Sequence, residues 1–76
     1  MTEPEFNELS ARIDAVGHTL LILMAELEVQ GALDGPRLSQ ALRRFGHDRG
    51  QHPGFERCGQ VMQELAQRLD TARARR

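Results

Sequence analysis

The 76-residue sequence contains no lysine, tyrosine or tryptophan, and aromatic residues make up only 4% of it. Its one cysteine, Cys58, excludes an intramolecular disulfide and a zinc site built on paired cysteines. The longest apolar run, Leu20 to Ala25, has six residues, too few for a membrane span or a signal peptide core. We therefore expect a cytoplasmic protein with no membrane segment and no stabilising crosslink.

The length predicts one helical domain, residues 1–76, and excludes a large enzyme. Apolar residues make up 39% of the chain and charged residues 28%, a balance typical of a folded protein. At this size the burial of apolar surface, at about 25 cal/mol per Å², roughly cancels an ordering cost of about 1.5 kcal/mol per residue. Oligomerisation is the expected source of additional stability.

The net charge of -1 conceals an asymmetry along the chain. Residues 1–35 hold seven acidic residues and Arg12 alone, a net charge of -6, whereas residues 36–76 hold nine arginines and four acidic residues, a net charge of +5. Such a division favours attraction to a charged partner or neutralisation within a dimer.

The first predicted helix covers about residues 3–30. It begins with a capping box, in which Thr2 is the N-cap and Glu5 reaches back to the free amides. Apolar residues then recur at alternating intervals of three and four, the spacing of a coiled coil. This row, here named the first seam, consists of Phe6, Leu9, Ile13, Val16, Leu20, Leu23 and Leu27.

Leu21, Ile22 and Met24 add a second apolar face to the middle of this helix. Burial of both faces requires two neighbours, one from the same chain and one from another subunit or a partner protein. Gly17 costs about 1 kcal/mol relative to alanine inside a helix, so it marks either a close helix crossing or a break in the helix, and we favour the crossing.

Two further helices are predicted at about residues 35–45 and 54–73, joined by a loop at residues 46–53 and followed by a basic tail, residues 73–76. Asp34 or Gly35 is the expected N-cap of the second helix. An apolar stripe, formed by Leu38, Ala41, Leu42 and Phe45, is its expected core face. A second seam on the third helix consists of Phe55, Cys58, Met62, Leu65, Leu69 and Ala72.

No set of residues predicts catalysis, a cofactor or a metal centre. The nearest approach to a metal site, His47, Asp48, His52 and Cys58, matches no standard zinc spacing, and His18 is expected at the surface. Ser10 and Ser39 lie on predicted helices without the strand-to-helix turn that exposes a nucleophilic serine. We expect no catalytic residue, no cofactor and no metal.

Residues 9–27 (LSARIDAVGHTLLILMAEL) resemble the first helix of the all-helical chorismate mutases. The matching residues are Leu9, Ile13, Asp14, Leu20, Leu21 and Leu23. The two substrate-binding arginines of that family align with Ser10 and Leu27, and its lysine has no counterpart here. The resemblance implies a long dimer-forming helix without the family's chemistry, a degenerate chorismate-mutase-like dimer being a remote alternative.

Arginines on the second helix and its loop form a candidate binding surface, here named the arginine face. Its members are Arg37, Arg43, Arg44 and Arg49. A protein with an acidic patch is the expected partner, because such charges set encounter rate and specificity. Nucleic acid is the alternative partner, but the near-zero net charge and the lack of exposed aromatic residues disfavour it.

These patterns together predict an all-α, three-helix chain that forms a helical homodimer through the first seam. The function we predict is that of a small non-enzymatic regulator or adaptor of bacterial or phage type. It occludes or bridges a partner protein, which it binds through the arginine face.

Overall fold

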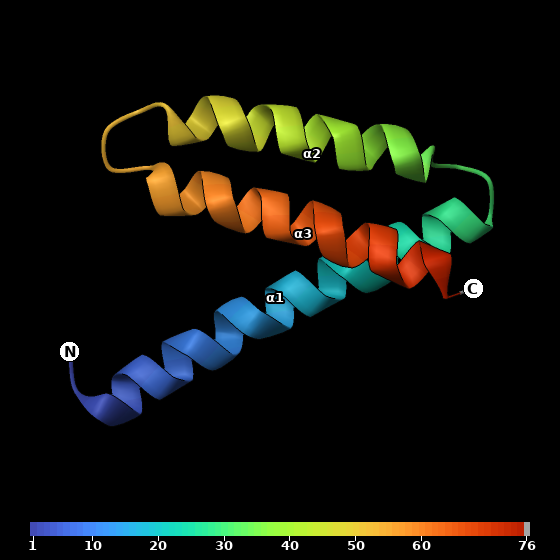
Figure 1. Ribbon diagram of the computed structural model, residues 1–76. Coiled ribbons are helices and arrows are strands. Elements are labelled where there is room, and N and C mark those ends of the chain that lie inside the picture. Colours follow the sequence, from blue (N-terminus) through green and yellow to red (C-terminus); the bar gives the residue numbers. More distant parts are fainter. Residues whose placement is uncertain (76) are drawn as a thin grey trace.

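The computed structural model describes residues 1–75, which form three helices and no strand. They are α1 (Glu3–Val29), α2 (Gly35–Gly50) and α3 (Glu56–Ala74). Helices α2 and α3 lie side by side and antiparallel, whereas α1 crosses the C-terminal end of α3 and runs away from the pair (Figure 1). The prediction of an all-α, three-helix chain is confirmed.

Local capping explains where α1 and α2 begin. The backbone N–H of Glu5 donates a hydrogen bond to Thr2 Oγ1 (3.3 Å), and the backbone N–H of Arg37 donates one to Asp34 Oδ1 (3.1 Å). Each bond satisfies one of the free amides of a first helical turn. Helix α1 ends before Gly31, whose φ of 77° an L-residue with a side chain rarely adopts.

Helix α2 extends five residues beyond its predicted end at residue 45. The predicted loop at 46–53 is consequently reduced to residues 51–55. Gly46 and Gly50 were interpreted as loop residues, but both lie within the helix because they face α3 at short range. Helix α3 begins at Glu56, two residues later than predicted, and includes Arg73 of the predicted basic tail. Arg76, the last residue of that tail, lies outside the described residues.

Small residues form the contact between α2 and α3. A Cβ atom on Gly59 would lie 2.3 Å from the carbonyl oxygen of Gly46 and 2.9 Å from the Cα of Gly50, so the two backbones touch directly. Further along the pair, Ser39 on α2 and Ala66 on α3 are fully buried, with 1% and 0% of their surface exposed. A helical hairpin held by small side chains has close-packed backbones and little apolar core.

The predicted core stripe of α2 is therefore not its contact with α3. Phe45 is 56% exposed, and Leu38, Ala41 and Leu42 are only half-buried. The second seam is only partly in the contact: Met62 Cβ lies close to Gly46 of α2 and Leu69 is buried, whereas Phe55 and Cys58 are exposed. Both predictions placed large apolar residues where the structure uses glycine, serine and alanine.

Within residues 1–75 the buried apolar residues are Ala66 and Leu69. A core of this size contributes little hydrophobic stabilisation. None of the helices described has the length and apolar character needed to cross a lipid bilayer.

Candidate protein-binding site

The first seam lies on the surface of α1. Its exposed members are Phe6 (60%), Leu9 (45%), Ile13 (63%), Val16 (60%), Leu20 (49%) and Leu23 (52%), whereas Leu27 is half-buried. These residues share one side of the helix and form a continuous apolar strip along most of its length. Contiguous exposed apolar surface of this kind marks an interaction site.

A different face of α1 contacts the rest of the chain. Leu21 and Ala25 lie beside Leu69 and Ala72 of α3, around an open hollow of about 340 Å³. Since successive helical residues are turned by about 100°, Leu21 faces roughly a quarter turn away from Leu20. The chain itself thus covers only part of the second apolar face of α1, since Leu21 and Met24 are half-buried and Ile22 is 64% exposed, and it leaves the first seam uncovered. The expected burial of both faces is not found within the chain.

Gly17 does not interrupt α1, which is helical from Glu3 to Val29. A Cβ atom built on Gly17 meets no atom within 4 Å, so no helix of the same chain crosses α1 there. The predicted crossing at Gly17 is absent within the chain.

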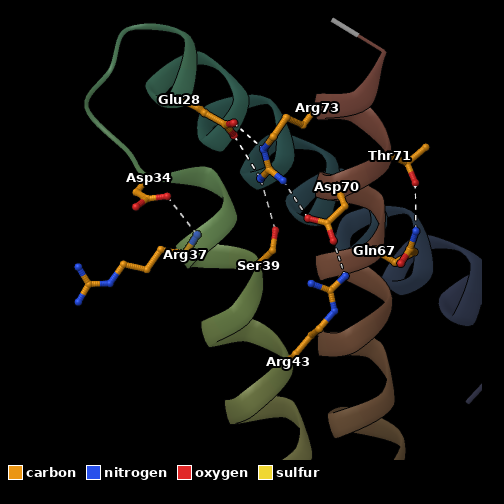
Figure 2. Close-up of polar contacts among 9 residues, drawn as sticks. All are labelled: Glu28, Asp34, Arg37, Ser39, Arg43, Gln67, Asp70, Thr71 and Arg73. Atoms are coloured by element: carbon orange, nitrogen blue, oxygen red, sulfur yellow. Dashed lines mark hydrogen bonds and ion pairs between the residues drawn. The ribbon is translucent and has the colours of Figure 1, made fainter.

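A network of charged side chains ties the three helices together at one end (Figure 2). Arg73 of α3 donates from Nε to Glu28 Oε1 of α1 (2.6 Å) and from Nη1 to Asp70 Oδ1 (2.9 Å). Its Nη2 atom lies 3.4 Å from both Glu28 Oε2 and the Ser39 hydroxyl of α2. Arg43 of α2 completes the network with a hydrogen bond to Asp70 Oδ2.

The network also shifts the acidity of its members. Hydrogen bonds from Arg43, Ser39 and Arg73 lower the pKa of Asp70 from 3.8 to about 2. Hydrogen bonds to Glu28 and Asp70 raise the pKa of the Arg73 guanidinium. Both groups are therefore charged at neutral pH, and the network stabilises the junction of α1 with the hairpin.

Gly35 makes room for this arrangement at the start of α2. A Cβ atom there would lie 2.0 Å from Glu28 Oε2, so only glycine allows the carboxylate its observed position. The carboxylate of Glu28 consequently lies at the N-terminal end of α2, where the helix dipole favours negative charge.

The four members of the arginine face have different surroundings. Arg37 points into solvent (Figure 2), and Arg44 lies with its guanidinium carbon 5.1 Å from the centre of the Phe45 ring. Arg49 is stacked 3.9 Å from the centre of the Phe55 ring. Arg43 instead belongs to the charge network, so its guanidinium already has a partner within the chain.

Histidine and cysteine side chains do not assemble into a ligand set. Within residues 1–75 no three His, Cys, Asp or Glu side chains lie close enough together to hold a metal ion. His18 lies at the surface of α1, where Nε2 is 3.6 Å from Asp14 Oδ1 and Nδ1 is 3.5 Å from Arg68 of α3. Cys58, which was expected within the second seam, is exposed.

Sequence reasoning did not identify a second exposed apolar area, at the loop end of the hairpin. It comprises Phe45 (56%), Phe55 (40%), Val61 (39%) and Cys58. The periodicity of Phe45, Phe55 and Cys58 predicted burial, and only the glycine contact between α2 and α3 shows that they face outward.

The chain matches no protein-family model, no curated protein and no solved structure. The resemblance to the chorismate mutases thus rests on residues 9–27 alone. Ser10, which stands at one of that family's arginine positions, is exposed on α1.

Proposed function

We propose that this protein is a non-enzymatic protein-binding regulator or adaptor that acts as a helical dimer and occludes or bridges a partner protein. The observation that carries the proposal is the exposure of the first seam along α1. Burial of such side chains on association contributes about 25 cal/mol per Å² of apolar surface removed from water. The very small core of the single chain supports the same interpretation, because a short chain commonly obtains its missing stability from a second subunit.

The first seam is the proposed dimer interface, and the arginine face is the proposed surface for an acidic partner. Arg37 and Arg44 are its best candidates, since both are exposed and neither forms an ion pair in residues 1–75. Arg49 lies near the C-terminal end of α2, turned away from them and stacked on Phe55. Arg43, which is held by Asp70, contributes to the partner surface only if that pair opens.

The test of dimerisation is light scattering on the purified protein across micromolar concentrations. We expect a dimer for the natural sequence and a monomer for Ile13→Asp, because the dimer would then bury an unpaired carboxylate. A loss of roughly 3 kcal/mol corresponds to a dissociation constant raised by more than about 100-fold. Ala11→Asp, on the side of α1 opposite the first seam, is the matched control and is expected to remain dimeric.

If the protein of natural sequence remains monomeric at these concentrations, the proposed dimer is refuted. The arginine face is tested separately with Arg37→Ala combined with Arg44→Ala, which should weaken capture of an acidic partner without altering the dimer. Retention of duplex DNA that falls steeply with salt would instead support nucleic-acid binding.

A further inference from the structure

The charged side chains of the network form a row of alternating charge that crosses all three helices (Figure 2). The row begins at Arg43 on α2, passes through Asp70 and Arg73 on α3, and ends at Glu28 on α1. Its inner members are shared, since Asp70 lies between two guanidinium groups and Arg73 between two carboxylates. A change at one end of such a row alters the bonds that the inner members make at the other end.

The members of this row differ in their access to solvent. The exposed fraction of the side chain falls from 40% at Arg43 to 32% at Asp70, 24% at Arg73 and 15% at Glu28. Arg43 is therefore the member that another molecule reaches first, and it also belongs to the arginine face. Glu28, the member that lies on α1, is the most shielded of the four.

Arg73 divides its donors between the two carboxylates. Its Nε and Nη2 atoms face Glu28, 2.6 Å from Oε1 and 3.4 Å from Oε2, whereas Nη1 donates to Asp70 Oδ1 (2.9 Å). The two Nη atoms together form another edge of the guanidinium, which can bind a carboxylate through both of its oxygens. Asp70 can take that edge if its Oδ2 atom loses Arg43.

Ser39 does not substitute for Arg43 in this balance. Its hydroxyl bonds to Asp70 and lies 3.4 Å from Arg73 Nη2, in a residue that is 1% exposed. A hydroxyl carries no net charge, so an ionised Asp70 that loses one guanidinium is attracted more strongly by the other.

The apolar contact between α1 and the hairpin is small. Leu21 and Ala25 lie against α3 around an open hollow, and both are only half-buried. The N-terminal part of α1 runs away from the pair (Figure 1). The bonds between Arg73 and Glu28 therefore carry an important share of the junction, because charge-assisted hydrogen bonds that are partly shielded from water are stronger than exposed ones.

We propose that this row of charges couples the arginine face to helix α1. An acidic group of the partner that binds Arg43 takes this guanidinium from Asp70. Asp70 then binds Arg73 through both oxygens, so Nη2 turns away from Glu28 and α1 is loosened from the hairpin. The partner thereby changes the freedom of the helix that carries the first seam. The inference rests on the proposed function for its trigger, whereas the coupling itself is a property of the single chain.

Arg43→Gln tests the coupling without a partner, because it takes the guanidinium charge away from Asp70. The measurement is amide hydrogen exchange, followed by NMR, in the last two turns of α1, residues 22–29. We expect exchange there to accelerate by about 3- to 10-fold more than in the middle of α2. Arg44→Gln is the matched control, since Arg44 is the next residue of α2 and is exposed, and it should leave exchange in α1 unchanged.

Asp70→Asn shows whether Arg43 acts through Asp70. In the Asp70→Asn background, the further change Arg43→Gln should leave exchange in α1 unchanged, since neutral asparagine transfers no charge to Arg73. Continued acceleration would show another route from Arg43 to α1 and would overturn the inference. Equal effects of Arg43→Gln and Arg44→Gln in the natural background would also overturn it, as would uniform acceleration of α1 and α2 by Arg43→Gln.

A second measurement uses the natural chain, with the peptide hexaglutamate as the acidic probe. The peptide should accelerate exchange in residues 22–29, and it should have no further effect there in Arg43→Gln. Binding of the peptide, seen as NMR shifts of α2 amides, without a change in α1 overturns the inference. A peptide that does not bind contradicts the arginine face of the proposed function, and the variants alone then decide the coupling.

Discussion

Gly59 lies so close to Gly46 that a Cβ atom on Gly59 would stand 2.3 Å from the Gly46 carbonyl oxygen. Because the atom in the way belongs to the backbone, it cannot move aside as the end of a flexible side chain can. The separation of α2 and α3 is therefore fixed by the absence of a side chain at this position. The charge network depends on that separation, because Arg43 and Ser39 of α2 bond to Asp70 and Arg73 of α3.

Gly59→Ala should consequently destabilise the protein. The gain in helix propensity, about 1 kcal/mol, is opposed by overpacking that typically costs about 1–3 kcal/mol and is larger where backbone must shift. We expect a net loss of about 1–2 kcal/mol in the free energy of unfolding, measured by urea denaturation followed by circular dichroism. An unchanged or higher stability would contradict the close contact.

Gly17→Ala should have the opposite effect and is the matched comparison. Gly17 is also within a helix, but a Cβ atom there meets nothing within 4 Å. Removal of glycine's freedom in the unfolded chain should then stabilise the protein by about 0.4–1 kcal/mol. The measurement is the same urea denaturation. A lower stability of the variant would indicate that another chain packs against Gly17.

Asp70 should make stability dependent on pH in the acid range. Its pKa is lowered from 3.8 to about 2 in the folded chain, so its contribution is complete above pH 4 and is lost as the pH falls toward 2. The difference in urea midpoint between the natural chain and Asp70→Asn should be largest above pH 4 and should shrink as the pH is lowered to 2. Asp48→Asn, which removes an exposed carboxylate without an ion pair in residues 1–75, should show no such trend.

Arg73→Lys should loosen the junction between α1 and the hairpin. Lysine keeps the charge but cannot reproduce the planar fork that contacts Glu28 and Asp70 together. We expect a loss of about 1–2 kcal/mol in stability. Hydrogen exchange should accelerate in α1 around Glu28 and less in the middle of α2. Arg75→Lys is the control, because Arg75 is exposed and forms no ion pair within residues 1–75; equal effects of the two changes would argue against the network.

The starts of α1 and α2 could be predicted because capping depends on neighbours in sequence. Thr2 and Asp34 each bond to an amide three residues later, and nothing distant alters that. The end of α2 could not be predicted in this way. A glycine such as Gly46 is compatible with either a helix end or a close helix contact. In the structure it makes a close contact, because Gly59 of another helix lies against it.

The candidate surfaces were also predictable only where they depend on neighbours in sequence, and not where they depend on another helix. Periodicity located the first seam, but it could not say whether the chain would cover that seam, since this depends on the direction in which α1 leaves the hairpin. Arg43 and Arg44 are adjacent in sequence and both were assigned to the arginine face. In the structure Arg43 belongs to the charge network and Arg44 is exposed. The difference arises because Arg43 bonds to Asp70, which lies 27 residues further along the chain.

The course of α1 away from the hairpin also determines how its N-terminal half can fold. Isolated helices of this length are marginal in water, and most helices in proteins owe their stability to tertiary packing. In a lone chain the segment before Gly17 has no such packing, so it would fray. If a second chain supplies the packing, helix formation and subunit encounter become a single event. The melting temperature would then depend on the protein concentration.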